Sequence, residues 1–300
     1  MNLRTTASKL ALALGRLCPV HAQGKAPVFC SLCGHRRGFP VPGGYNIREA
    51  WCPDCGAKRR SSDLVSALLR VVGANPSSCL SNEMGSLADL RIYEAQADGI
   101  LHAALAGLPH YTCSEYLDTT PGGAIGADGI RCEDLQHLTF PDDSFDLVIS
   151  QDVLEHVAQP WQAFREVERV LKPGGHHLFT VPIHEGHPTI TRARSENGQP
   201  VVLLPPVHHG DPLRTTGSLV YTDFGDDLPD LLSARSIDAR MVVRGHDYRP
   251  REIPWVNSVE EHQRYQSARS SGQLLGYFRY NSIVFQTRKA SRLQQTRRQT

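Results

Sequence analysis

The apolar positions change from one period to another in the middle of the chain. Residues 145–150 form a short apolar run rich in β-branched side chains, which predicts a buried strand. From Pro160 the apolar residues recur every three or four positions, as on an amphipathic helix that begins at a proline. We expect this helix to end at residues 172–175, where proline cannot continue it and glycine supplies a left-handed exit. A second apolar run, residues 177–181, then predicts two parallel strands joined by a right-handed crossover.

Similar patterns predict further elements on both sides of this unit. A helix is expected to begin near Asp63, with Leu64, Leu68 and Val71 on one face. Other runs predict strands at residues 90–93, 111–114, 238–243 and 281–287, and helices at 100–108 and 228–234. Residues 1–26 predict a poorly ordered or helical terminus, and residues 289–300 a solvated basic tail.

Composition limits the classes of protein to be considered. A chain of 300 residues with 40% hydrophobic content can build a globular core. Its 32 basic and 31 acidic residues give a net charge of +1, so no overall field attracts nucleic acid or an anionic membrane. Residues 10–17 are too short for a membrane span and lack a convincing cleavage site. We therefore expect a cytoplasmic protein without a membrane partner.

Four of the eight cysteines lie in two Cys-x-x-Cys-Gly motifs, Cys30 with Cys33 and Cys52 with Cys55. Four thiolates at this spacing suit a tetrahedral zinc ion, and with no open position such a site would be structural. Free cysteines or a redox pair are the alternatives. Arg36, Arg37 and residues 58–60 make the module basic, which is typical of a solvated surface but leaves nucleic acid as a second interpretation.

The sequence FDLVISQDVLEHV followed by AFREVERVLKPGG resembles the later half of the class I S-adenosylmethionine-dependent methyltransferases, in the type 11-like branch. The resemblance extends to about residue 240 through HGDP, GSLV and DFGDD. It implies an α/β fold with a Rossmann-like, doubly wound, seven-stranded sheet that closes in an antiparallel pair. We assign residues 27–60 to a zinc ribbon and residues 61–288 to the methyltransferase domain.

The resemblance also implies cofactor-binding residues. Glu94 and Gly99 would border the loop after the first strand, although this family usually has a run of alternating glycines there and this chain keeps only Gly99. Glu115, at the end of the second strand, would accept the ribose hydroxyls, with Asp118 as the nearest competitor. Residues 130–135 resemble the third acidic motif, so the adenine amino group would bind Asp134 and the ring would pack on Leu135. A register slip of one residue would give the role of Asp134 to Glu133.

Asp152, Leu154 and His156 follow the fourth family strand and would lie beside the cofactor. His156 and Asp152 are weak catalytic candidates, because methyl transfer from a sulfonium needs alignment more than acid or base. Residues 184–217 predict a substrate-facing lid that presents His184, His209 and Asp211. A second metal site among these histidines is the less favoured alternative.

These observations predict a methyltransferase that uses S-adenosylmethionine and a structural zinc ion on a small-molecule or saccharide acceptor. One alternative is a non-catalytic module of the same fold that has lost its cofactor affinity. Another is a nucleic-acid methyltransferase that uses the basic ribbon.

Overall fold

The computed structural model describes residues 29–36, 50–75, 77–117, 119–184, 187–211, 214–225, 227–243, 246–248 and 283–291. The predicted terminal segment 1–26, Arg37, Asp118 and most of the basic tail lie outside these residues.

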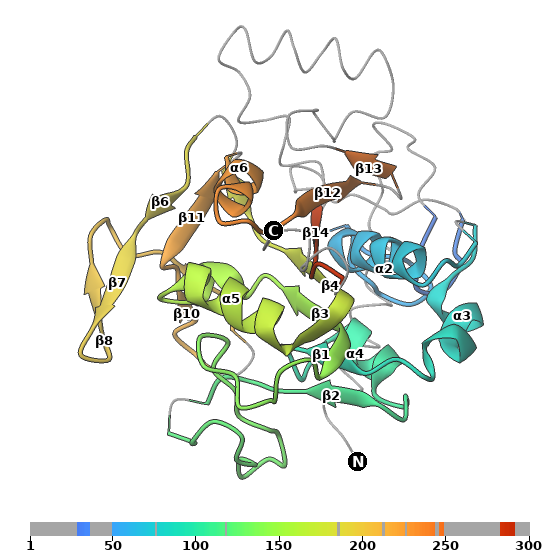
Figure 1. Ribbon diagram of the computed structural model, residues 1–300, viewed down its shortest axis with the longest axis horizontal. Helices are drawn as coiled ribbons and strands as arrows, with labels where there is room; N and C mark the ends of the chain where they lie inside the picture. The colour runs from blue at the N-terminus through green and yellow to red at the C-terminus, as the bar shows by residue number, and fades with distance from the viewer. Residues whose placement is uncertain are drawn as a thin grey trace, which may run out of the picture.

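A seven-stranded sheet crosses the middle of the molecule in the order β13-β12-β14-β4-β3-β1-β2 (Figure 1). Its strands are β1 (Ile92–Glu94), β2 (Tyr111–Cys113), β3 (Phe145–Gln151), β4 (Leu171–Thr180), β12 (Ala239–Val243), β13 (His246–Tyr248) and β14 (Val284–Arg288). The first four strands pair in parallel, while β14 is antiparallel to both β4 and β12. The predicted parallel unit and the antiparallel closing pair are both confirmed.

The third acidic motif does not form a strand of its own. It meets the sheet edge in an isolated parallel bridge between Glu115 and Cys132, next to β2. Two backbone hydrogen bonds hold it there, from Glu115 N to Arg131 O and from Glu133 N to Glu115 O, both 3.0 Å. The seventh strand is instead β13, at the opposite edge, where it pairs with β12.

Helix α5 (Pro160–Val170) begins at the predicted proline. The turn after it lies inside β4, not before that strand as predicted. Leu171 pairs with Phe145, and the next pair joins His176 to Leu147, so residues 172–175 form a bulge in the ladder. Gly174 takes a φ of +86°, the left-handed conformation expected of the glycine at this position.

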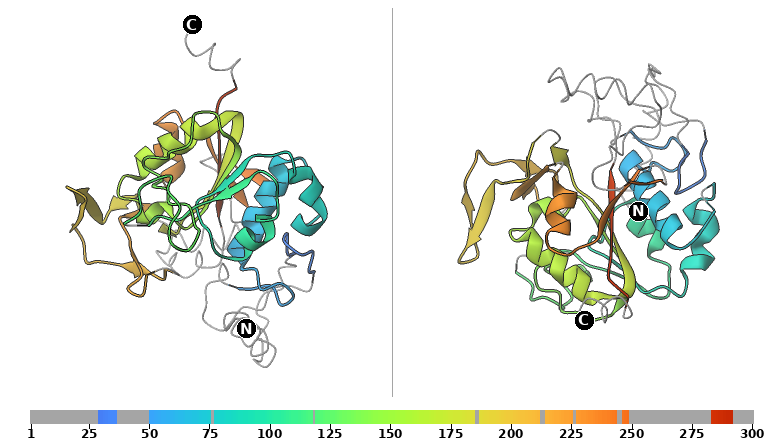
Figure 2. Two further views of the ribbon diagram at one scale, coloured as in Figure 1. Left: turned by 90° about the horizontal axis from the view of Figure 1, so that it is seen from below. Right: turned by 45° about the horizontal axis from the view of Figure 1, so that its top comes forward.

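Helices cover both faces of the sheet (Figure 2). Neighbouring strand residues alternate between two buried clusters, as the pleat requires: Val148 faces the side of α5 and α6 (Leu228–Ser233), and Leu147 and Ile149 face the other side. That other side carries α2 (Arg59–Val71), α3 (Leu80–Leu87) and α4 (Ile100–Leu105). The α2 helix confirms the helix predicted near Asp63, and it begins four residues earlier.

The predicted lid is rich in short strands and projects from the side of the sheet (Figure 1). Strands β5 (Ile183–His184), β11 (Thr222–Gly225) and β6 (Ile190–Thr191) form one small sheet in that order. Strands β7 (Ala193–Glu196) and β8 (Gln199–Val202) form a hairpin, and β9 (His208–His209) pairs with β10 (Ser218–Leu219).

Candidate functional site

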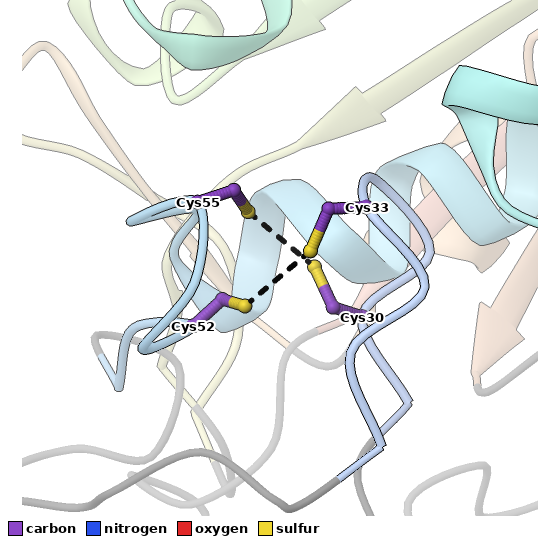
Figure 3. A group of neighbouring side chains, drawn as sticks. All are labelled: Cys30, Cys33, Cys52 and Cys55. Carbon is purple, nitrogen blue, oxygen red and sulfur yellow. Dashed lines mark hydrogen bonds between the residues drawn. The ribbon is translucent and has the colours of Figure 1, made fainter.

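The four predicted cysteines converge on one point (Figure 3). The Sγ atoms of Cys30 and Cys55 are 3.7 Å apart, and those of Cys33 and Cys52 are 3.6 Å apart. Four sulfurs at about 2.3 Å from a tetrahedral zinc ion would be separated by about 3.8 Å. Both of these distances therefore fit such an ion.

The two knuckles have the same backbone conformation. In the first, Gly34 N donates to Cys30 O at 2.8 Å, and in the second Gly56 N donates to Cys52 O at 2.8 Å. Both glycines have a positive φ, +83° and +78°, which L side chains rarely adopt. The tight turns predicted from the two glycines are thus present.

Backbone N–H groups point at the sulfurs, as these turns predict. The thiol of Cys55 lowers the pKa of Cys30 to about 5, with help from the N–H groups of Cys33 and Leu32. Burial raises the pKa of Cys52 to about 12. Only a cation at the centre would favour four thiolates together, so the donor set suits a metal ion.

The knuckles pack against the α/β domain through shared buried residues and direct hydrogen bonds. Cys30 and Cys52 belong to the same buried cluster as α2 and α3. Ser31 N donates to Ser62 Oγ at 2.9 Å, and Leu80 N donates to Ser31 O at 2.7 Å. The four-cysteine module and these helices therefore form one packed unit.

The first turn of α2 extends this connection to the carboxyl end of β3. Ser61 Oγ donates to Gln151 Oε1 at 3.0 Å, and Arg60 Nε lies 3.3 Å from Asp152 Oδ2. Asp152 adopts a φ of +54° and also accepts a hydrogen bond from Thr180 Oγ1 at 2.9 Å. Asp152 is thus positioned by two neighbouring elements.

A crevice is expected beside β1, because the strand order reverses there. Strand β1 pairs with β2 on one side and with β3 on the other, and ligands of doubly wound sheets bind outside the carboxyl ends at such a point. Glu115 lies at this end of β2 and accepts a hydrogen bond from Ala97 N at 2.8 Å. Burial raises the pKa of Glu115. The predicted ribose acid therefore contacts the predicted cofactor loop, and Gly99 in that loop has a φ of +96°.

Glu94 ends β1 and is only 2% exposed. Its Oε2 accepts a hydrogen bond from the Tyr111 hydroxyl at 2.7 Å, and that hydroxyl lies 2.9 Å from His102 Nδ1. Burial raises the pKa of Glu94 to about 8, against the opposing effect of the Tyr111 hydrogen bond. The acid after the first strand is therefore a member of a buried network.

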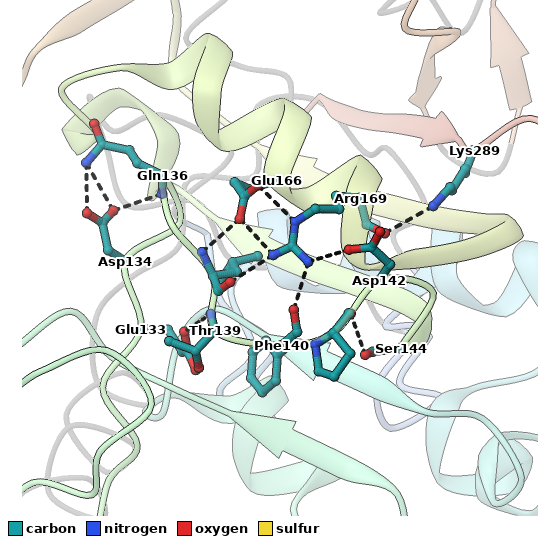
Figure 4. A network of polar contacts seen from close by, with 12 residues as sticks. Glu133, Asp134, Gln136, Thr139, Phe140, Asp142, Ser144, Glu166, Arg169 and Lys289 are labelled. Atoms are coloured by element: carbon teal, nitrogen blue, oxygen red, sulfur yellow. Dashed lines mark hydrogen bonds and ion pairs between the residues drawn. The ribbon is translucent and has the colours of Figure 1, made fainter.

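The structure distinguishes between the two acids of the third motif (Figure 4). Glu133 is buried, and its oxygens accept hydrogen bonds from Arg131 Nε, Thr139 Oγ1 and Thr139 N. Asp134 is partly exposed and is bonded by the backbone and side chain of Gln136. Glu133 thus holds the loop together, and Asp134 remains the candidate for the adenine.

Two residues that were predicted to contact the cofactor, Leu154 and Leu135, are buried among apolar side chains. Leu154 has no exposed surface and lies in the buried cluster under α5, so it does not line an open crevice. Leu135 belongs to the same cluster and is 6% exposed. Their neighbour His156 lies at the end of η2 (Leu154–His156), where its Nδ1 donates to the Leu219 carbonyl at 2.8 Å.

The lid residues divide into two groups. Asp211 accepts hydrogen bonds from Arg214 and Ser218, and Arg214 donates to Tyr116 O at 3.2 Å beside the end of β2. His184 is on the other side of this region, 3.6 Å from Asp223 of β11. The lid thus brings Asp211, but not His184, toward Glu115.

His209 of β9 approaches η2 instead. Its ring centroid lies 5.0 Å from that of His156, and its Nδ1 lies 3.7 Å from Glu155 Oε1. Glu155 is 1% exposed. Its place beside two histidines depends on a contact between residues more than fifty positions apart, which no local pattern in the sequence contains.

Part of the sheet is similar in sequence to known methyltransferases. Residues 113–179, from β2 to β4, match the family model described as "Methyltransferase domain". This match and the order of the strands in the sheet support the predicted class I methyltransferase fold. An "Uncharacterized methyltransferase" of Mycobacterium tuberculosis is 46% identical over 55 residues, which are 18% of this chain and 19% of that protein. The chain therefore spans about a fifth of the length of the curated relatives that it matches.

Solved structures similar to this chain include methyltransferases and a cyclase. The crystal structure of the [4+2]-cyclase SpnF has a TM-score of 0.39 at 18% identity and covers 80% of this chain and 86% of its own. An S-adenosylmethionine-dependent methyltransferase of Mesorhizobium loti has a TM-score of 0.37 at 16% identity, over 70% of this chain and 95% of its own. Among the helices that the structure describes, none has the length and apolar character of a membrane span.

Proposed function

We propose that this chain transfers a methyl group from S-adenosylmethionine to a small-molecule or saccharide acceptor. The observation that carries the proposal is the position of Glu115, at the carboxyl end of β2 and hydrogen-bonded to Ala97 N in the loop after β1. A carboxylate at this point of a doubly wound sheet can accept both hydroxyls of a ribose. The match of residues 113–179 to a methyltransferase domain supports the same reaction.

Each neighbouring residue has a role in this proposal. Glu115 binds the ribose, and Asp134 accepts from the adenine amino group. Gly99, at a φ of +96°, lets the backbone of the loop turn close to the cofactor. The cofactor supplies an electrophilic methyl on a sulfonium, whose leaving group is a neutral thioether. The chain's own contribution is mainly alignment of the acceptor and exclusion of water.

The four-cysteine cluster holds a structural zinc ion in this proposal. The sulfur spacing of 3.6–3.7 Å supports zinc, and the donor set leaves no position for water. The ion would stabilise the knuckles, and these in turn pack on α2, whose first turn contacts Gln151 and Asp152. Zinc would therefore support the crevice from a distance.

A small acceptor suits the charge of the chain and the lid beside the crevice. The net charge is +1, which offers little attraction to a polyanion. In addition to burial, Asp211 of the lid raises the pKa of Glu115, and Arg214, which is paired with Asp211, opposes this effect. The charges beside Glu115 are therefore largely balanced, which suits a small acceptor better than a polyanion.

A second candidate function is a binding module that has lost the cofactor. Its specific support is Glu94, which is almost wholly buried and bonded to Tyr111, next to a loop that keeps only Gly99 of the usual glycines. In this alternative the loop has closed on the crevice.

Isothermal titration of the zinc-loaded protein with S-adenosylhomocysteine separates the two candidates. We expect micromolar binding that Glu115→Gln weakens by about 1–3 kcal/mol, the scale of a hydrogen bond to a charged group. Asp128→Asn is the matched control, because Asp128 is an exposed acid on a loop and its replacement removes the same charge. No binding by the wild-type protein would refute the transferase and favour the binding module.

A further inference from the structure

The strongest unexplained feature outside the cysteine cluster is the buried carboxylate of Glu155. It is 1% exposed, and neither of its oxygens has a hydrogen-bond partner. Removing a carboxylate from water without hydrogen bonds is costly, so such a group normally pairs with a cation. The backbone around it is well held, since Tyr221 N donates to Glu155 O at 2.8 Å. Only the carboxylate oxygens lack a hydrogen-bond donor.

Two imidazoles flank this carboxylate at equal distances. His156 Nε2 and His209 Nδ1 each lie 3.7 Å from Glu155 Oε1, which is beyond hydrogen-bond length. One ligand atom from each of the three residues lies within 4.8 Å of the other two. Two ligands at about 2.1 Å from a tetrahedral ion are about 3.4 Å apart, so both carboxylate–imidazole distances are within a few tenths of an ångström of that value.

The hydrogen bond of His156 fixes which of its nitrogens faces the carboxylate. Its Nδ1 lies 2.8 Å from the Leu219 carbonyl, which can only accept, so Nδ1 carries the proton. Nε2 is therefore the ring nitrogen that is left to bind a metal ion, and it is the one that faces Glu155. Metal-binding histidines commonly donate their other ring nitrogen to a backbone carbonyl in this way.

We infer that Glu155, His156 and His209 form a second metal site, for a divalent transition-metal ion of which zinc fits best. Two histidines and one carboxylate are a common ligand set for zinc and for ferrous iron, and three protein ligands leave at least one position open. The His209 side chain is 39% exposed, so an ion can enter without unfolding of the domain. Such an ion would fasten β9 of the lid to η2 at the end of β3.

Metal content tests this site without cofactor or acceptor, so the result does not depend on the proposed methyl transfer. The full-length protein is loaded with zinc, dialysed, and measured by native mass spectrometry. We expect two equivalents in the wild type and one in Glu155→Gln and His209→Gln. His208→Gln is the matched control, because His208 is the exposed neighbour on the same strand and should leave two equivalents.

A second measurement identifies which site loses its ion. In the cobalt-substituted protein, thiolate-to-cobalt charge-transfer absorption reports the cysteine site alone, and it should persist in both variants while the second equivalent is lost. His209→Gln keeps the test decisive if the buried Glu155→Gln variant fails to fold. One equivalent in the wild type would overturn the inference and leave Glu155 paired with a protonated histidine. Two equivalents in His209→Gln would also overturn it.

Discussion

Glu94 offers a quantitative test of the packing around the crevice. Burial raises its pKa from 4.5 to about 8, and its Oε2 accepts the Tyr111 hydroxyl. Between pH 4.5 and pH 8, Glu94 is protonated in the folded protein and ionised in the unfolded chain. The stability contributed by this proton is fully present below pH 4.5 and is lost as the pH rises through 8.

The size of the effect follows from the shift. One pKa unit is worth about 1.4 kcal/mol, so the ligand-free wild type should lose about 2 kcal/mol of unfolding free energy between pH 6 and pH 8 through this group. Glu94→Gln keeps the side-chain size and an oxygen that can accept from Tyr111, but it cannot ionise. The variant should therefore gain about 2 kcal/mol relative to the wild type over the same interval.

Urea unfolding of the zinc-loaded proteins at pH 6, 7 and 8 measures this difference, and thermal unfolding should show a relative shift of about 4 °C. Glu83→Gln is the control, since Glu83 lies on α3, where its Oε2 accepts an exposed hydrogen bond from Ser86 Oγ at 3.3 Å. Parallel pH curves for the wild type and Glu94→Gln would refute a raised pKa for Glu94.

Three further predictions concern the supporting structure. Cys30→Ser should remove one zinc equivalent and abolish the zinc dependence of the melting temperature, and it should weaken S-adenosylhomocysteine binding about tenfold by loosening α2. Unchanged affinity would show that the cysteine cluster does not support the crevice. Arg169→Ala should lower the free energy of unfolding in denaturant by about 2–3 kcal/mol, because Arg169 donates to Phe140 O and Glu166 (Figure 4) and to Leu138 O. Arg165→Ala on the same helix, where the exposed Arg165 bonds only Gln162 among the residues described, should change it by less than about 0.5 kcal/mol. Gly34→Ala should lower the free energy of unfolding by about 1–2 kcal/mol, because the φ of Gly34 is +83° and a Cβ there would meet Cys79 Sγ at 3.3 Å. Gly85→Ala in α3, with open space around it, should be neutral or stabilising, and equal effects of the two substitutions would contradict the strain argument.

The predictable part of the fold is the part encoded by local periodicity. The apolar run of β3 and the helical spacing of α5 each depend on residues within one element, and both were predicted to within a residue or two. The bulge at residues 172–175 was recognised as a turn but not as part of β4. These residues lie within β4 because Leu171, just before them, already pairs with Phe145 of β3, and a local pattern does not reveal such a contact between strands.

The site was predictable where the motif itself fixes the geometry. Two Cys-x-x-Cys-Gly motifs predicted four converging sulfurs, because each motif specifies its own turn. The directions of the side chains after β3 could not be predicted in the same way. A 3₁₀ turn directs Leu154 into the core, and Glu155 is buried beside His209, whose position depends on the path of the whole lid.

The shared core of the cysteine knuckles and α2 also bears on how this chain can be divided. A fragment that begins at residue 59 would present Leu64, Leu68 and Leu80 to water without Cys30, Leu32 and Cys52, which belong to the same buried cluster. Such a fragment would be expected to aggregate. The two parts are therefore not interchangeable modules. If another ribbon replaced this one, the chain would fold only if the surface of α2 and α3 changed to match it.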